Sequence, residues 1–213
     1  MGRSIPARNN VAAALLLLMA AGPVALAPNT VAASMNSTEL VSSLRDGGHV
    51  VFIRHATTEK DYADQVSATM GDCSTQRVLS EAGWAEARKI GRAFVRLGIP
   101  VDTVISSEYC RAWQTADLAF GRYDKSSDLN FEPAETYTEA QTKAMRGRMT
   151  PHLSRVPTQG ANTVLVGHDD PFEAATGIYP EPMGIAFILC PQGEGRFEIL
   201  GSIKPDAWPQ DLN

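Results

Sequence analysis

The chain has 213 residues, of which 44% are hydrophobic, and its formal net charge is −5 at pH 7. This composition is sufficient for the hydrophobic core of one domain, and it excludes an intrinsically disordered chain. An acidic balance without a run of basic residues also excludes a typical nucleic-acid-binding protein.

The first 33 residues have the layout of a secretory signal peptide. Arg3 and Arg8 precede an apolar run at 11–21, and a stretch rich in Ala and Pro follows. We expect cleavage after Ala33, in preference to Ala27, which Pro28 follows. The apolar run is shorter than the roughly 20 residues that a membrane span needs. We therefore expect a mature domain of residues 34–213 that is periplasmic or secreted, with no membrane span after signal removal.

Within residues 34–213, candidate strands alternate with candidate helices. Helices are expected from Asn36 or Ser37 to Gly47, at 81–97, at 112–120, and at 139–156 with an interruption near 149–151. Strands are expected at 49–54, 101–107, 129–133 (weaker), 163–166, 185–189 and 197–203. The alternation predicts an α/β fold with a mostly parallel sheet and right-handed crossovers. The long polar segment 57–78 is expected to be a functional or mobile loop.

Three of these strands end near basic residues. The first runs directly into Arg54 and His55, the second is followed by Arg111, and the fourth ends at His168 and Asp169. Because the carboxyl ends of parallel strands meet at one edge of a sheet, these side chains are expected to converge on one crevice.

Two arginines and two histidines would make a cationic pocket in an otherwise acidic chain. Guanidinium groups bind phosphate in bidentate fashion, so a phosphoryl group is the anion that fits best. One imidazole can attack phosphorus while the other donates hydrogen bonds to the phosphoryl oxygens. A carboxylic acid such as Asp169 can protonate the leaving oxygen. Arg77, in the long loop, is expected to be a solvated side chain, with reach into this pocket as the alternative.

The chain has three cysteines, Cys73, Cys110 and Cys190. In an oxidising compartment three pairings are possible, and one thiol remains over. We expect a disulfide between Cys73 and Cys110, because each lies in a loop that follows an early strand at the same sheet edge. No metal site is expected, since the sequence has no Cys-x-x-Cys and no histidine pair at helical spacing.

Four motifs in this order resemble those of the histidine phosphatase superfamily, also called phosphoglycerate-mutase-like. They are Arg54-His55-Ala56-Thr57-Thr58, Leu79-Ser80-x-x-Gly83, Ser106-Ser107-x-x-x-Arg111-Ala112-x-Gln114-Thr115-Ala116, and Gly167-His168. The similarity runs from about His49 to Cys190. It implies a three-layer α/β/α sandwich that needs no metal or other cofactor, with His55 as the phosphorylated nucleophile. The implied phosphate-binding residues are Arg54, His55, Thr58, Arg111 and His168.

The chain also departs from the family pattern. Ala56 replaces the usual glycine after the Arg-His pair, Thr57 replaces a common glutamate, and Asp61 stands where an asparagine is frequent. The proton donor depends on the branch of the family. The mutase-like branch points to Glu135, and the acid-phosphatase branch points to Asp169, which we favour.

Together these observations predict an exported phosphatase that hydrolyses a phosphomonoester through a phosphohistidine intermediate. Its partner would be a phosphorylated small molecule or cell-envelope component. Two alternatives remain: a phosphoglycerate-mutase-like phosphotransferase, and a non-catalytic phosphate-binding or interaction module of the same fold. Turnover of an activated aryl phosphate separates an enzyme from a binding module, because such a leaving group needs little protonation.

Overall fold

The computed structural model describes residues 1–2, 30–31, 34–59, 68–134 and 136–211. The predicted signal peptide therefore lies almost entirely outside the described residues, and Asp61 and Glu135 lie outside them as well. Within the segment predicted to be a signal peptide, the strand β1 (Thr30–Val31) pairs in parallel with the last strand of the chain, β7 (Arg196–Ile203). None of the helices in the described part of the chain has the length and apolar character needed to cross a bilayer.

One mixed sheet runs through the centre of the domain. Its other strands are β2 (Val50–Arg54), β3 (Val101–Ser106), β4 (Asp124–Lys125), β5 (Asn162–Gly167) and β6 (Ala186–Gly193). The strand order is β1-β7-β6-β2-β5-β3-β4, and only the pairings of β6 with β2 and β7 are antiparallel. The strands β2, β5 and β3 are parallel neighbours, so their carboxyl ends lie at one edge. The predicted mostly parallel sheet is confirmed.

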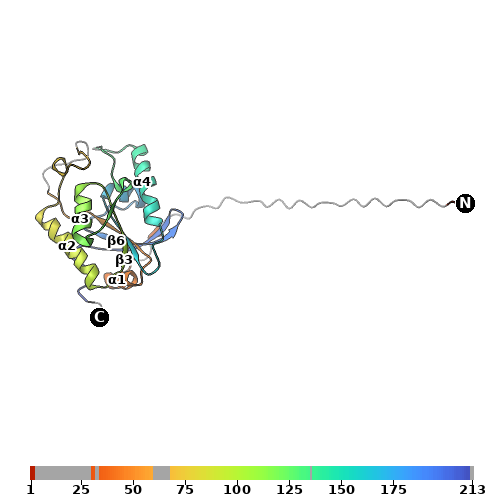
Figure 1. The fold of residues 1–213 in the computed structure, drawn as a ribbon, viewed down its shortest axis with the longest axis horizontal. Helices are drawn as coiled ribbons and strands as arrows, with labels where there is room; N and C mark the ends of the chain where they lie inside the picture. The colour runs from red at the N-terminus through yellow and green to blue at the C-terminus, as the bar shows by residue number, and fades with distance from the viewer. Residues whose placement is uncertain (3–29, 32–33, 60–67, 135, 212–213) are drawn as a thin grey trace.

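Helices cover both faces of the sheet (Figure 1). They are α1 (Ser37–Asp46), α2 (Glu81–Arg96), α3 (Cys110–Phe120), α4 (Glu139–Ser154) and α5 (Asp169–Thr176). One core cluster joins α1, α2 and α3 to the sheet, and a second joins α4 and α5 to its opposite face. This arrangement is the three-layer α/β/α sandwich that the sequence predicts.

The strand β2 is apolar at four consecutive positions, 50–53, because both of its faces are buried. Val51 and Ile53 contribute to the core under α1, α2 and α3, whereas Val50 and Phe52 contribute to the core under α4 and α5. The Phe52 ring stacks on Phe172 of α5, with ring centroids 4.2 Å apart. Because both faces of the strand are covered, its residues do not alternate between apolar and polar. Such a continuous apolar run is usual for a central parallel strand.

Two local predictions are wrong. Residues 129–133 do not form a strand; the sheet edge is instead completed by β4, and a short 3-10 helix, η2 (Ser127–Leu129), follows. Leu129 and Phe131 are buried because they pack against other side chains, and burial of alternate residues resembles a strand pattern. The helix α4 continues through Pro151 to Ser154 without interruption, and Met149 and Leu153 anchor its last turns in the core.

The helices α2 and α3 approach each other closely at Gly91. A Cβ atom at this position would lie 2.0 Å from the carbonyl oxygen of Ala119 in α3. In contrast, a Cβ at Gly147 of α4 would meet nothing within 4 Å. The two glycines therefore serve different purposes, although each lies inside a helix.

We predict that Gly91→Ala destabilises the protein by about 1–3 kcal/mol through overpacking. Gly147→Ala is the matched control, and it should stabilise the protein by about 0.5–1 kcal/mol because alanine is the better helix former. Thermal unfolding followed by circular dichroism measures both. An unchanged melting temperature for Gly91→Ala would contradict the close helix contact.

Candidate active site

His55 lies at the carboxyl end of β2, at the edge where β5 and β3 also end. Its backbone N–H donates to the carbonyl of Gly167 at 2.9 Å, and its own carbonyl accepts from the N–H of Gly184 at 3.1 Å. The side chain is fully buried. These backbone contacts fix where the imidazole leaves the sheet.

The hydrogen bonds of His55 define its tautomer. Nδ1 lies 2.9 Å from the carbonyl oxygen of Ala56, an acceptor, so Nδ1 carries the proton and donates. Nε2 then has a free lone pair, which accepts from Nε of Arg111 at 3.1 Å. Burial, followed by the charge of Arg111, lowers the pKa of His55 well below its usual 6.5. His55 is therefore uncharged, with a basic nitrogen directed at an arginine.

Arg111 belongs to the first turn of α3 and is 3% exposed. Its guanidinium carbon lies 5.3 Å from the centroid of the Tyr109 ring and 5.2 Å from that of Phe131. The two rings stack on each other at 4.2 Å. Aromatic faces attract a guanidinium group, and here they support the cation while its edge points toward His55.

His168 follows β5, and its ring lies edge-on to His55 with centroids 5.4 Å apart. Its Nε2 lies 2.8 Å from Oγ of Ser107, and that hydroxyl donates to Oδ1 of Asn130 at 2.7 Å. Because the hydroxyl proton is used toward Asn130, His168 Nε2 carries its own proton and donates to Ser107. Within the described part of the chain, Nδ1 of His168 is buried without a hydrogen-bond partner. Burial and the charge of Arg111 also lower the pKa of His168 well below 6.5.

Arg54 is held in place by three groups. Its Nη1 donates to the carbonyl of Pro180 at 3.0 Å, and its Nη2 forms an ion pair with Asp169 Oδ2 at 2.6 Å. The Tyr179 hydroxyl donates to the same carboxylate oxygen at 2.6 Å, and the Tyr179 ring lies 5.2 Å from the guanidinium carbon. Asp169 thus binds Arg54, whichever further role it has.

The turn after His55 is held by residues of the second and third motifs. The N–H of Ala56 donates to Oγ1 of Thr115 at 3.0 Å. The carbonyl of Thr57 accepts from both the N–H and the hydroxyl of Ser80, which caps α2. A Cβ at Gly83 would lie 1.9 Å from that carbonyl oxygen, so only glycine allows α2 to begin here. These motif residues therefore position the turn.

The structure brings most of the predicted site residues together. His55, Arg111 and His168 form one buried cluster, and Arg54 and Asp169 form a pair beside it. The hydroxyl of Thr58 donates to Sδ of Met183 at 3.7 Å, a weak interaction that a substrate oxygen can replace. Glu135 lies outside the described residues.

Sequence reasoning missed three residues that support the site. Asn130 orients Ser107, Tyr179 binds the Asp169 carboxylate, and Glu86 accepts from the N–H and hydroxyl of Thr57 at 2.8 and 2.9 Å. No local pattern marks them, because each acts through a segment distant in sequence. Ser107 and Thr115 lie inside a recognised motif, so a signal for them existed.

The α/β layers thus place a buried, uncharged histidine at the strand edge beside Arg111. The sequence model of the histidine phosphatase superfamily (branch 1) matches residues 50–159, more than half of the chain. The chain therefore belongs to the histidine phosphatase superfamily. This agrees with the resemblance carried by the four motifs.

Curated relatives share a shorter segment. The mitochondrial serine/threonine-protein phosphatase Pgam5 of Drosophila persimilis is 34% identical over 76 residues, which cover 36% of this chain and 23% of the relative. The corresponding protein of Drosophila grimshawi is 33% identical over 84 residues, covering 38% and 26%. The chain thus matches about a quarter of the length of these relatives.

Solved structures share the fold across most of the domain. The protein histidine phosphatase SixA, complexed with tungstate, has a TM-score of 0.54 at 15% identity, covering 74% of this chain and 97% of SixA. A phosphoserine phosphatase mutant from Entamoeba histolytica, in complex with phosphoserine, has a TM-score of 0.51 at 11% identity, covering 72% and 95%. At such identities the similarity establishes the fold alone.

The low pKa values of His55 and His168 predict a pH-dependent stability. Each histidine binds fewer protons in the folded state than in the unfolded state, where its pKa is near 6.5. The contribution to stability is therefore complete above pH 6.5 and is lost as the pH falls, at up to about 1.4 kcal/mol per pH unit for each histidine. Burial lowers the pKa of His49 too, so it adds to this slope.

Chemical denaturation between pH 7.5 and 5 measures this dependence. We expect His55→Gln/His168→Gln to flatten the slope, since neither replacement side chain titrates. A slope equal to that of the parent protein would show that the two histidines are not buried in the neutral form.

Proposed function

We propose that this protein is an exported phosphatase that hydrolyses a phosphomonoester through a phosphohistidine formed at His55. The observation that carries the proposal is the buried, uncharged imidazole whose basic Nε2 faces Arg111 at 3.1 Å. Membership of the superfamily supports phosphatase-type activity. The similar Pgam5 and SixA proteins are named as phosphatases, which adds to that support.

In the first step, His55 Nε2 attacks phosphorus, forming a P–N bond while the bond between phosphorus and the leaving oxygen breaks. The leaving oxygen takes a proton from a carboxylic acid. In the second step, water attacks the phosphohistidine, its proton passes to the carboxylate, and inorganic phosphate leaves with His55 uncharged again. Arg54 and Arg111 stabilise the phosphoryl charge throughout, which is the main catalytic requirement of such a transfer.

The contact between Arg111 and His55 is suited to exchange. A phosphoryl group that enters between them takes over the guanidinium N–H groups, and this leaves the Nε2 lone pair available for attack. The same negative charge raises the pKa of His168. Once protonated, the buried Nδ1 of His168 becomes a donor for a phosphoryl oxygen, which gives a role to an atom that has no hydrogen-bond partner among the described residues.

Export and substrate belong to the same proposal. The N-terminal layout supports a signal peptide of residues 1–33, and the disulfide between Cys73 and Cys110 fits an oxidising compartment such as the periplasm or the extracellular space. A phosphorylated small molecule or envelope component would be the substrate.

Removal of the signal peptide predicts that N-terminal sequencing of protein recovered from the envelope fraction gives a sequence that begins at Ser34. An intact Met1 would contradict removal of the signal.

The covalent mechanism predicts that the parent protein gains acid-labile phosphate during turnover of p-nitrophenyl phosphate. His55→Ala should lose the label and lower kcat by at least about 10³-fold, because the nucleophile is gone. Rapid quenching followed by phosphohistidine detection measures the label. His152→Ala is the control, since His152 lies in α4 and its imidazole interacts with the carboxylate of Asp128.

The alternatives give different results in this experiment. A parent protein that binds phosphate but shows neither label nor turnover is the non-catalytic binding module. A labelled parent that passes phosphate to a second hydroxyl compound faster than to water is a mutase-like phosphotransferase. Either result would replace the phosphatase proposal.

The proton donor is proposed to be Asp169 or Glu135, and leaving groups of different basicity separate the roles of Asp169. If Asp169 is the donor, Asp169→Asn should lower kcat on glycerol phosphate by about 10²–10⁴-fold and on p-nitrophenyl phosphate much less. If Asp169 acts only by orienting Arg54, Asp169→Asn should lower kcat on both substrates by the same factor and should also raise KM.

Two further variants complete this test. Tyr179→Phe removes one hydrogen bond to Asp169 but leaves its ion pair with Arg54, so it should not change the ratio between the two substrates. Glu135→Gln should show the dependence on leaving group if Asp169→Asn does not. Steady-state kinetics on purified mature protein supplies the ratio of kcat on the two substrates for the parent protein and for each of the three variants.

A further inference from the structure

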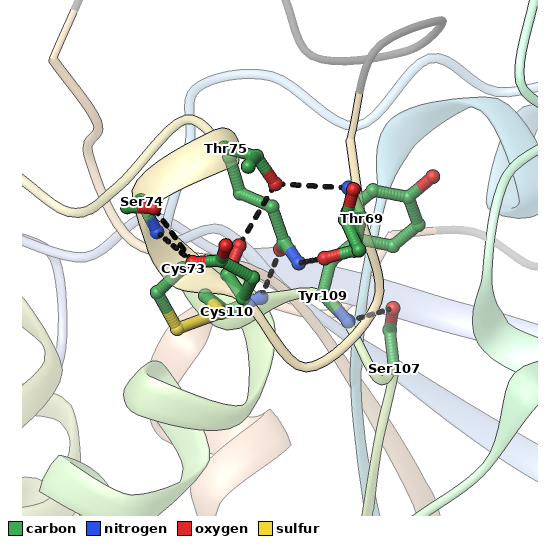
Figure 2. The surroundings of a disulfide bond; sticks show 9 residues. Thr69, Cys73, Ser74, Thr75, Ser107, Tyr109 and Cys110 are labelled. Atoms are coloured by element: carbon green, nitrogen blue, oxygen red, sulfur yellow. Dashed lines mark hydrogen bonds between the residues drawn. A yellow bond between two sulfur atoms is a disulfide. The ribbon is translucent and has the colours of Figure 1, made fainter.

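The long loop after the catalytic strand is joined covalently to the helix that carries Arg111. Cys73 begins a short 3-10 helix, η1 (Cys73–Thr75), and forms a disulfide with Cys110, the first residue of α3. The two Cα atoms are 5.7 Å apart although 37 positions separate them in the sequence. This confirms the predicted pairing, and Figure 2 shows it beside the start of α3.

A buried side chain makes a second connection at the same place. Oε1 of Gln76 accepts from the backbone N–H of Cys110 at 2.8 Å, and its Nε2 donates to the carbonyl of Thr69 at 3.0 Å. The first N–H groups of a helix have no partner within the helix, and Tyr109, at the N-cap of α3, supplies no side-chain cap. Gln76, which is fully buried, therefore caps α3 from the loop.

The loop segment 68–79, here called the strap, is also bonded internally. Oδ1 of Asp72 accepts from the N–H and the hydroxyl of Ser74 at 3.0 and 2.6 Å. The Thr75 hydroxyl accepts from the N–H of Thr69 and donates to the carbonyl of Asp72, both at 2.9 Å (Figure 2). These hydrogen bonds hold residues 69–75 of the strap together as a compact unit.

The far end of the strap pairs with the turn that follows His55. Leu79 forms an antiparallel bridge with Thr58, and the N–H of Glu59 donates to the carbonyl of Val78 at 3.1 Å. Arg77 therefore lies between two anchored residues: Gln76, which is hydrogen-bonded to the start of α3, and Val78, which is hydrogen-bonded to the turn that follows His55. It is half-buried, and its charge is among the causes that lower the pKa values of both His55 and His168.

We propose that the Cys73–Cys110 disulfide and Gln76 are positioning groups that hold the strap against α3, and that the strap supplies Arg77 as a third arginine of the phosphate pocket. The proposal rests on the proposed function, because it assigns a phosphoryl group to that pocket. Arg111 follows Cys110 directly, so the same connection also fixes its approach to His55.

The consequence is that phosphate affinity depends on residues at a distance from the phosphorus atom. Arginine binds a phosphoryl oxygen by charge-assisted hydrogen bonds, which require a defined direction. A strap that is released from α3 leaves the charge of Arg77 on the protein but no longer fixes its distance from the pocket. Arg77 and the disulfide should therefore act as one unit.

The experiment measures binding of inorganic phosphate by calorimetry, well below the melting temperature of every variant. Arg77→Gln should raise Kd about tenfold or more, the loss expected for a charge-assisted hydrogen bond. Arg77→Lys should recover part of that loss. Cys73→Ser/Cys110→Ser and Gln76→Leu should also raise Kd, and Cys190→Ser, which changes the free cysteine, should not.

A double-mutant cycle decides whether Arg77 and the disulfide act together. We expect Arg77→Gln to cost much less in the background without the disulfide than in the parent protein. Additive losses, or a Kd unchanged in Cys73→Ser/Cys110→Ser while only its melting temperature falls, would overturn the proposal. The Kd readout needs no turnover, so a parent that binds inorganic phosphate but does not hydrolyse p-nitrophenyl phosphate refutes the proposed function and leaves this test intact.

The pH profile gives a second readout that a merely structural role would not change. Because the charge of Arg77 lowers the pKa of both histidines, Arg77→Gln should move the histidine-dependent step in the pH profile of phosphate binding to higher pH, and Arg77→Lys should not. A profile for Arg77→Gln that coincides with that of the parent protein would place Arg77 outside the pocket.

Discussion

Two uncharged imidazoles are buried beside guanidinium groups at the carboxyl edge of the sheet, and the rest of the site depends on this arrangement of positive charge. A buried cation is costly unless an anion accompanies it. Asp169 accompanies Arg54, and Nε of Arg111 is directed at the lone pair of His55 while its guanidinium group rests on aromatic rings. Two guanidinium groups thus lie at one edge of the sheet, and burial, followed by the charge of Arg111, keeps the pKa of His55 low and its imidazole uncharged.

The supporting residues act mainly on the backbone. Ser80 and Gly83 let the start of α2 contact the carbonyl of Thr57, and Thr115 accepts from the N–H of Ala56 while donating to the carbonyl of Arg111 at 2.7 Å. One threonine thereby links the turn after His55 to the helix that carries Arg111. Residues of different sequence motifs thus belong to one hydrogen-bonded framework in the structure.

The departures from the family pattern are accommodated locally. Ala56 replaces the usual glycine, and it packs with Leu79 and Ala87 in a small apolar cluster. Thr57 replaces a common glutamate, and it binds the carboxylate of Glu86 through its N–H and its hydroxyl. Desolvation raises the pKa of Glu86, while these two hydrogen bonds lower it. The substituted turn thus keeps contacts that hold it in place.

The sequence by itself determined the layers of the fold and which basic residues meet at the carboxyl edge of the sheet. Caps such as Asn36 and Ser80 and the apolar run of β2 are local signals, and the parallel strand ends follow from the alternation of elements. Only the tertiary structure decided the tautomer of His55, the orientation of His168 by Ser107, and the pairing of Arg54 with Asp169, 115 positions apart. Such contacts depend on which strands become neighbours and on how closely their side chains approach, and no local pattern encodes either.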